Sequence, residues 1–138
     1  MIYKYTPAHK HLTQMPSCCW PTCVQMILFR NDIWIEQEQL AFNLWLVIEE
    51  NNVAYYTLPF KVVPKWDPTH WLKFYRFKEH QIIDVLRWFW FIPKVIYYWN
   101  FWDFETLIIE NISKNKDIII NFKWEWISQN DHVWWHIA

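Results

Sequence analysis

The stretch SCCWPTCVQMIL, residues 17–28, predicts the beginning of a helix that carries a cysteine at its N-terminal end. Pro21 suits the first turn of a helix, because the N–H group that proline lacks has no intrahelical partner there. Apolar residues then recur at helical spacing and predict one buried face, formed by Val24, Ile27 and Leu28. We therefore predict a helix over 20–30 that begins beside Cys19.

Cys19 is the candidate for a reactive thiol, because free N–H groups and the helix dipole stabilise a thiolate at a helix N-terminus. Cys18 lies one residue outside the helix, and Cys23 lies inside it, where a packed thiol is expected. The spacing of Cys19 and Cys23 also leaves a zinc site open as an interpretation. No second pair of ligands follows at a fixed spacing, so we expect neither a metal nor a cofactor.

The overall composition indicates a small protein without a basic surface. The 138 residues carry 13 basic and 14 acidic side chains, with a net charge of −1, so we expect no binding to nucleic acid. The sequence has no apolar run of the roughly 20 residues that a membrane-spanning helix needs. The N-terminus lacks the apolar core of a signal peptide. Three closely spaced cysteines form a poor disulfide framework, which favours a reducing, cytoplasmic setting.

The chain contains 13 tryptophans and no glycine, although glycine makes up about 7% of an average protein. The tryptophans fall at predicted turns and helix ends, where glycine is the usual residue. Trp34 follows the first predicted helix, and Trp99 and Trp102 flank the start of the last one. We hypothesise that most of the tryptophans stand at positions that were glycine in a parent sequence, with a strain of about 1 kcal/mol or more wherever φ is positive. The alternative is a core rich in tryptophan.

The pattern of apolar residues predicts helices first and strands clustered at the end, which is an α+β order. The predicted helices cover residues 20–30, 35–44, 78–87 and 103–115. A connection with short strands is expected over 51–77, and longer strands are predicted over 91–99, 116–123 and 132–138. No linker interrupts this order, so we expect one domain over residues 1–138.

Two motifs resemble a known family when tryptophan is read as glycine. CWPTC then resembles a Cys-Gly-Pro-Thr-Cys helix opening, and VWWHIA resembles a Gly-Gly-His strand. Together with Gln14, which precedes the cysteines, this pair is similar to the papain-like cysteine peptidases. Within that group it is similar to the bacteriocin-processing peptidases, which remove double-glycine leaders, and to their stand-alone relatives.

The resemblance implies a papain-like fold, with N-terminal helices packed on a C-terminal antiparallel sheet. It implies Cys19 as the nucleophile, His136 as the general base and Gln14 as the oxyanion-hole donor. The implied activity is hydrolysis of a peptide bond in a peptide or protein substrate. The family also includes domains of peptide-exporting transporters, so the chain is expected to stand alone or to form part of a larger protein.

The sequence departs from the family pattern near each implied residue. Trp20 stands where the family has glycine, and Gln14 lies one residue closer to Cys19 than is common. The acidic member of the triad normally follows the histidine, whereas Asp131 precedes His136, so we expect the acid beyond residue 138 and a domain truncated at its C-terminal end. These departures leave an alternative: an inactive or acyl-transferring papain-like domain that binds a peptide.

Overall fold

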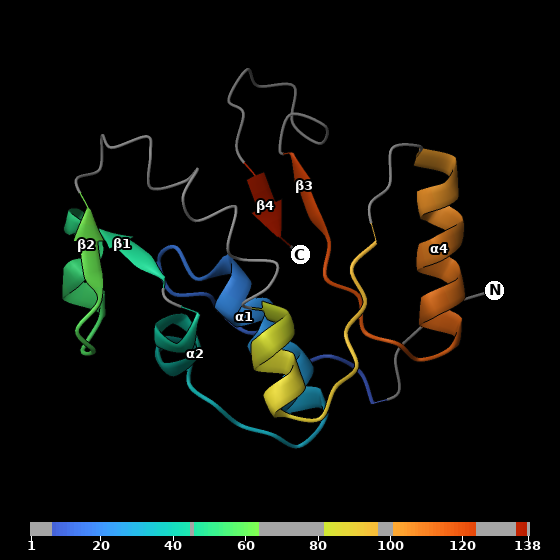
Figure 1. Cartoon of the computed structure of the whole chain (residues 1–138), viewed down its shortest axis with the longest axis horizontal. Coiled ribbons are helices and arrows are strands. Elements are labelled where there is room, and N and C mark those ends of the chain that lie inside the picture. Colours follow the sequence, from blue (N-terminus) through green and yellow to red (C-terminus); the bar gives the residue numbers. More distant parts are fainter. Residues whose placement is uncertain (1–6, 45, 64–81, 97–100, 124–134, 138) are drawn as a thin grey trace.

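The fold is known from a computed structural model, which describes residues 7–44, 46–63, 82–96, 101–123 and 135–137 (Figure 1). Its helices include α1 (Cys19–Arg30), α2 (Gln37–Asn43), the 3-10 helix η1 (Glu50–Tyr55) and α4 (Phe101–Ser113). Its strands are β1 (Val47–Glu49), β2 (Lys61–Val63), β3 (Asn121–Lys123) and β4 (Trp135–Ile137). A further helix covers residues 82–88. No helix in the described ranges is both long enough and apolar enough to cross a membrane.

The main hydrophobic core lies where α1, α2 and the helix over 82–88 meet. Apolar side chains at helical spacing on each helix form one buried cluster, which contains Val24, Ile27, Leu28, Leu40, Leu44, Ile82, Val85 and Leu86. The helix predicted over 20–30 is therefore confirmed, and so is the one predicted over 35–44. The latter begins only at Gln37, because Glu36 is still extended at φ −64° and ψ 143°. Of the helix predicted over 78–87, residues 82–87 are helical and 78–81 lie outside the described residues.

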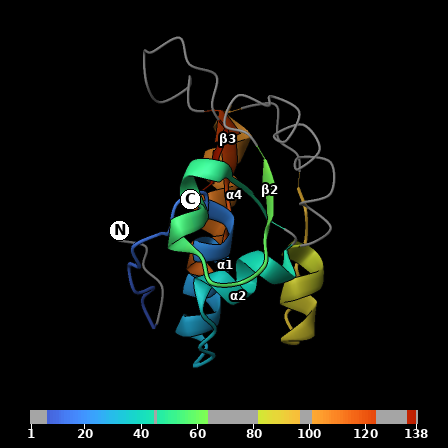
Figure 2. The same cartoon turned by 90° about the vertical axis from the view of Figure 1, so that its left-hand side faces the viewer.

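The described strands form two small sheets, each with two strands. β1 pairs with β2 in parallel, with Ile48 opposite Val62. β3 pairs with β4 in the antiparallel sense, with Phe122 opposite His136. In both Figure 1 and Figure 2, the β3–β4 pair lies above α1. The predicted α+β class is confirmed at this level, and the parallel β1–β2 pair was not predicted.

Two predicted strands are largely wrong. Residues 91–96 form neither helix nor strand, and 97–99 lie outside the described residues. Pro93 has no N–H group to donate to a neighbouring strand, and Ile92 is 98% exposed, so no core draws this segment into a sheet. In the strand predicted over 116–123, only Asn121–Lys123 are paired, and 117–120 are half-buried.

The remaining C-terminal elements follow the predictions with shifted bounds. α4 begins at Phe101 rather than at residue 103, so Trp102 lies inside its first turn. The strand predicted over 132–138 is confirmed for Trp135–Ile137, whereas 132–134 and 138 lie outside the described residues.

Three helices end in the same backbone motif, with one residue in the left-handed region. These residues are Asp32 after α1 (φ 61°), Trp90 after the helix over 82–88 (φ 67°) and Asn115 after α4 (φ 58°). At the end of α1, the N–H of Ile33 reaches back 2.9 Å to the carbonyl oxygen of Leu28. The other two ends repeat this backward bond, which defines a Schellman motif. Glycine is the usual residue at the left-handed position of this motif.

Of the tryptophans that the structure describes, Trp90 stands where the backbone itself favours glycine, and the others have backbone conformations open to any residue. Trp20, Trp88 and Trp102 lie in helices, and Trp135 lies in a strand. Trp90 is the one described tryptophan with a positive φ. Asp32 and Asn115 hold the left-handed positions at the other two helix ends, because their short polar side chains tolerate this conformation.

Trp34 was expected at the left-handed position after the first helix. That position belongs to Asp32 instead. The Trp34 ring lies edge-on to Phe29, with 5.1 Å between the ring centroids. Its indole N–H donates to Oε1 of Glu36 at 2.8 Å. Trp34 therefore contributes contacts of its own rather than standing in for a glycine. Trp99, the other expected case, lies outside the described residues.

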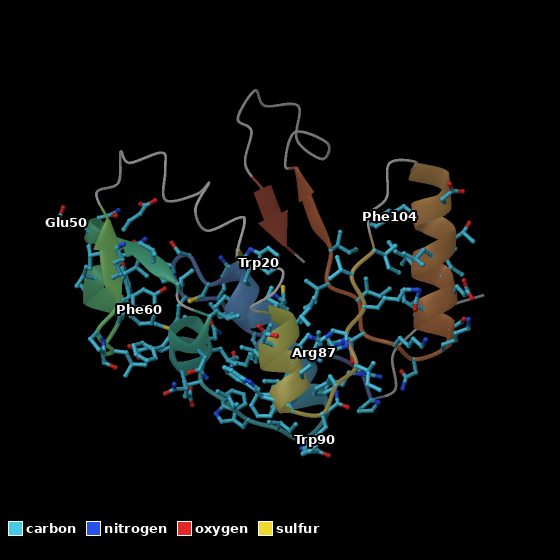
Figure 3. All side chains as sticks on the ribbon, viewed as in Figure 1. Trp20, Glu50, Phe60, Arg87, Trp90 and Phe104 are labelled. Carbon is cyan, nitrogen blue, oxygen red and sulfur yellow. The ribbon has the colours of Figure 1, made fainter. Side chains whose placement is uncertain are left out.

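The replacement Trp90→Gly is expected to raise the free energy of unfolding by about 1 kcal/mol. The Trp90 side chain is 94% exposed and lies at the periphery of the molecule (Figure 3), so its removal loses little burial. Urea denaturation measures the change. Trp90→Ala is the control, because alanine removes the indole but keeps the Cβ that disfavours positive φ. Equal stabilisation by alanine and glycine would show that the indole, not the backbone, is responsible.

Candidate active site

A tight turn leads the chain into α1. The N–H of Cys18 donates to the carbonyl oxygen of Met15 at 3.0 Å. Pro16 takes the second position of this turn, and Ser17 takes the third with φ 61°, which defines a type II turn. Cys19 is the first residue of α1 and is half-buried. The helix predicted to begin beside Cys19 therefore begins one residue earlier, at Cys19 itself.

Cys18 is fully buried and is held by Tyr56. Its Sγ lies 3.1 Å from the Tyr56 hydroxyl, which also donates to the carbonyl oxygen of Pro16. Because the hydroxyl has one proton and gives it to Pro16, the Cys18 thiol is the donor in its own contact with Tyr56. Burial raises the pKa of the Cys18 thiol to about 11. Cys18 is therefore a protonated, structural thiol near neutral pH.

Cys23 lies one helical turn after Cys19 and is half-buried. Burial is the main cause that raises its pKa to about 12, and a negative charge on Cys19 adds to the effect. Near neutral pH, Cys23 therefore also stays protonated. Two of the three thiols are thus unsuited to nucleophilic attack, which favours Cys19 as the reactive one.

The raised pKa of Cys18 predicts a loss of stability at alkaline pH. The folded chain holds the thiol proton more tightly than the unfolded chain, whose thiol titrates near 9. The stabilisation is therefore complete below about pH 9 and is lost as the pH rises through about 11. We expect the free energy of unfolding to fall by on the order of 2–3 kcal/mol across this window. Urea titrations at stepped pH measure the slope. The slope should become shallower in Cys18→Ala, where Cys23 with its raised pKa still contributes, and an unchanged slope would contradict the assignment.

β4 brings the backbone of His136 to the side of α1. Contacts between β4 and α1 connect the C-terminal strand to the helix that Cys19 begins. Figure 3 labels Trp20 at the end of α1 that is nearer to β4. For β4, the structure describes the backbone. Asp131 lies outside the described residues.

Gln14 is exposed and lies in the segment that precedes the turn. Its two neighbours are bound by one side chain, that of Gln37 on α2. The Gln37 Nε2 donates to the carbonyl oxygen of Thr13 at 2.7 Å, and its Oε1 accepts from the N–H of Met15 at 2.9 Å. Sequence reasoning missed Gln37, because it resembles any polar residue on the exposed face of a helix.

Among the residues that the structure describes, the cysteines are not part of a metal site. Within the ranges that the structure describes, no three His, Cys, Asp or Glu side chains gather as metal ligands would. Cys18 is turned to Tyr56 instead. The zinc interpretation therefore gains no support from the described ligands.

The structure thus places three predicted parts in α1 or beside it. Cys19 begins the helix, the segment that contains Gln14 is bonded to α2 beside it, and the strand that contains His136 lies against the same helix. The interpretation of this site rests on these residues, since no family model, curated protein or solved structure matches the chain.

Proposed function

We propose that the chain is a papain-like cysteine peptidase domain that hydrolyses a peptide bond, with double-glycine leader peptides as the substrate class. The observation that carries this proposal is the position of Cys19 at the first residue of α1, with β4 against the same helix. A cysteine at a helix N-terminus with a histidine on an adjacent strand is the arrangement that the resemblance implies. The burial and raised pKa of Cys18 and Cys23 support the choice of Cys19.

The proposed reaction has two steps. His136 takes the thiol proton of Cys19, and the sulfur attacks the peptide carbonyl carbon. The C–N bond then breaks, the leaving amine takes the proton from His136, and a thioester remains. Water hydrolyses this thioester to release the acid and restore the thiol. Gln14 donates a hydrogen bond to the oxyanion that forms in each step.

Trp20 bears on the alternative of an inactive domain that binds a peptide. Trp20 is half-buried, and its side chain packs against the core cluster of α1, α2 and the helix over 82–88. An indole that packs against the core leaves more room beside Cys19, where a substrate would approach, than an indole that points away from the core. This contact favours the active enzyme over the peptide-binding alternative.

Iodoacetamide at neutral pH is expected to alkylate Cys19 at least roughly tenfold faster than Cys18 or Cys23, because alkylation requires the thiolate. Mass spectrometry of peptides from the partly modified chain measures the three rates. In Cys19→Ser, the fast phase should disappear. Faster modification of Cys18 or Cys23 than of Cys19 would contradict the proposal.

A further inference from the structure

Gln37 makes an unusual pair of bonds to the backbone on either side of Gln14. Its amide N–H donates to Thr13 and its amide oxygen accepts from Met15, at 2.7 and 2.9 Å. A residue on a parallel strand forms the same two bonds, to the carbonyl before and the N–H after the residue that it faces. The side chain of Gln37 therefore takes the place of a neighbouring strand for the backbone at Gln14.

The same amide oxygen also connects this segment to α1. The hydroxyl of Thr22 lies 2.9 Å from Oε1 of Gln37 and 2.7 Å from the carbonyl oxygen of Cys18. Thr22 is buried in the first turns of α1, so its position is fixed relative to Cys19. The hydroxyl has one proton, which these two acceptors share. One side chain thus joins the backbone around Gln14 to the helix that Cys19 begins.

We propose that Gln37 is the positioning residue of the oxyanion site, which sets the place of Gln14 relative to the sulfur of Cys19. This inference rests on the proposed function. An oxyanion donor must lie within hydrogen-bond distance of the oxygen that becomes charged, so a small displacement removes its effect. Gln14 is exposed, and the bonds to Thr13 and Met15 restrict the backbone that carries it.

The aldehyde acetyl-glycyl-glycinal separates the oxyanion site from the thiol. The Cys19 S–H adds across the aldehyde C=O: a C–S bond forms, the π bond breaks, and the proton ends on the oxygen. The resulting hemithioacetal places this oxygen in the oxyanion site. Alkylation by iodoacetamide displaces iodide at a CH₂ group and develops no oxyanion, so it reports on the thiol alone.

The variant Gln37→Ala is expected to bind acetyl-glycyl-glycinal at least roughly tenfold more weakly than the wild type. Its rate of Cys19 alkylation by iodoacetamide should stay within about twofold, since the thiol is unchanged. Gln37→Glu keeps the acceptor for Met15 and loses the donor to Thr13, so we expect partial retention of binding. Gln39→Ala is the matched control on the same helix, because Gln39 is exposed and its amide donates to Asn43 instead. This control should bind as the wild type does.

A second variant decides whether Gln37 acts through Gln14. In a Gln14→Ala background, the further change Gln37→Ala should have no additional effect on aldehyde binding. An additional tenfold loss in that background would overturn the inference, and so would wild-type binding by Gln37→Ala alone. Failure of the wild type itself to bind the aldehyde, with Cys19 unreactive to iodoacetamide, would instead refute the proposed function.

Discussion

The variant Cys19→Ala is expected to lose peptide cleavage by a factor of at least about 10³, because the nucleophile and the covalent intermediate are both removed. Release of aminomethylcoumarin from acetyl-Gly-Gly-aminomethylcoumarin measures this loss. The fold should persist, since Cys19 is half-buried and is not part of the main core cluster.

Cys23→Ala is the matched control for this experiment. It removes a thiol one helical turn away and leaves Cys19 in place. We expect it to retain cleavage within about threefold, because its protonated thiol has no part in the proposed reaction. Equal loss in both variants would indicate damage to α1 rather than to a nucleophile. Undiminished cleavage in Cys19→Ala would contradict the proposed function.

The variant Arg30→Ala is expected to lower the free energy of unfolding by about 3–5 kcal/mol, the usual cost of breaking a buried ion pair from one side. The Arg30 side chain is 5% exposed and donates to Asp117 at 2.8 Å. It also donates to the side chain of Asn115 at 2.6 Å and to the carbonyl oxygen of Pro7 at 2.7 Å. Its loss therefore releases two segments from the end of α1, and His9 remains beside Asp117 at 2.6 Å.

Arg87→Ala provides the control for Arg30→Ala. The Arg87 side chain is 63% exposed and lies 4.0 Å from Asp84, as a surface pair does. Its removal should change the free energy of unfolding by less than about 0.5 kcal/mol. Urea denaturation of both variants gives the comparison. Similar losses in the two variants would contradict the structural role assigned to Arg30.

The helices were predictable because their apolar residues repeat at the helical period. The face of Val24, Ile27 and Leu28 reached the core as expected, and so did Leu40 on α2. The strand predicted over 91–99 failed because its apolar residues carry no period and Pro93 interrupts the hydrogen bonding. The parallel pairing of Val47–Glu49 was missed, because three residues carry too little pattern to indicate a partner far along the chain.

The candidate site was predictable only where it is local in sequence. The place of Cys19 at the start of α1 follows from Pro21 and the apolar repeat after it. The approach of β4 to α1 depends on packing between the ends of the chain, which no local pattern encodes. The bonds of Gln37 to Thr13 and Met15 depend likewise on how α2 folds back beside the N-terminal segment.

The central claim is that Cys19 and His136 act as a pair, and the pH dependence of Cys19 alkylation tests it most directly. The rate with iodoacetamide is measured from about pH 5 to about pH 10 in the wild type and in His136→Ala. A neighbouring imidazolium stabilises the thiolate, so we predict that the wild-type rate rises with an apparent pKa below about 7.5. In His136→Ala, the apparent pKa should move toward the ordinary thiol value of about 8.5. Identical profiles in the two proteins would contradict the claim.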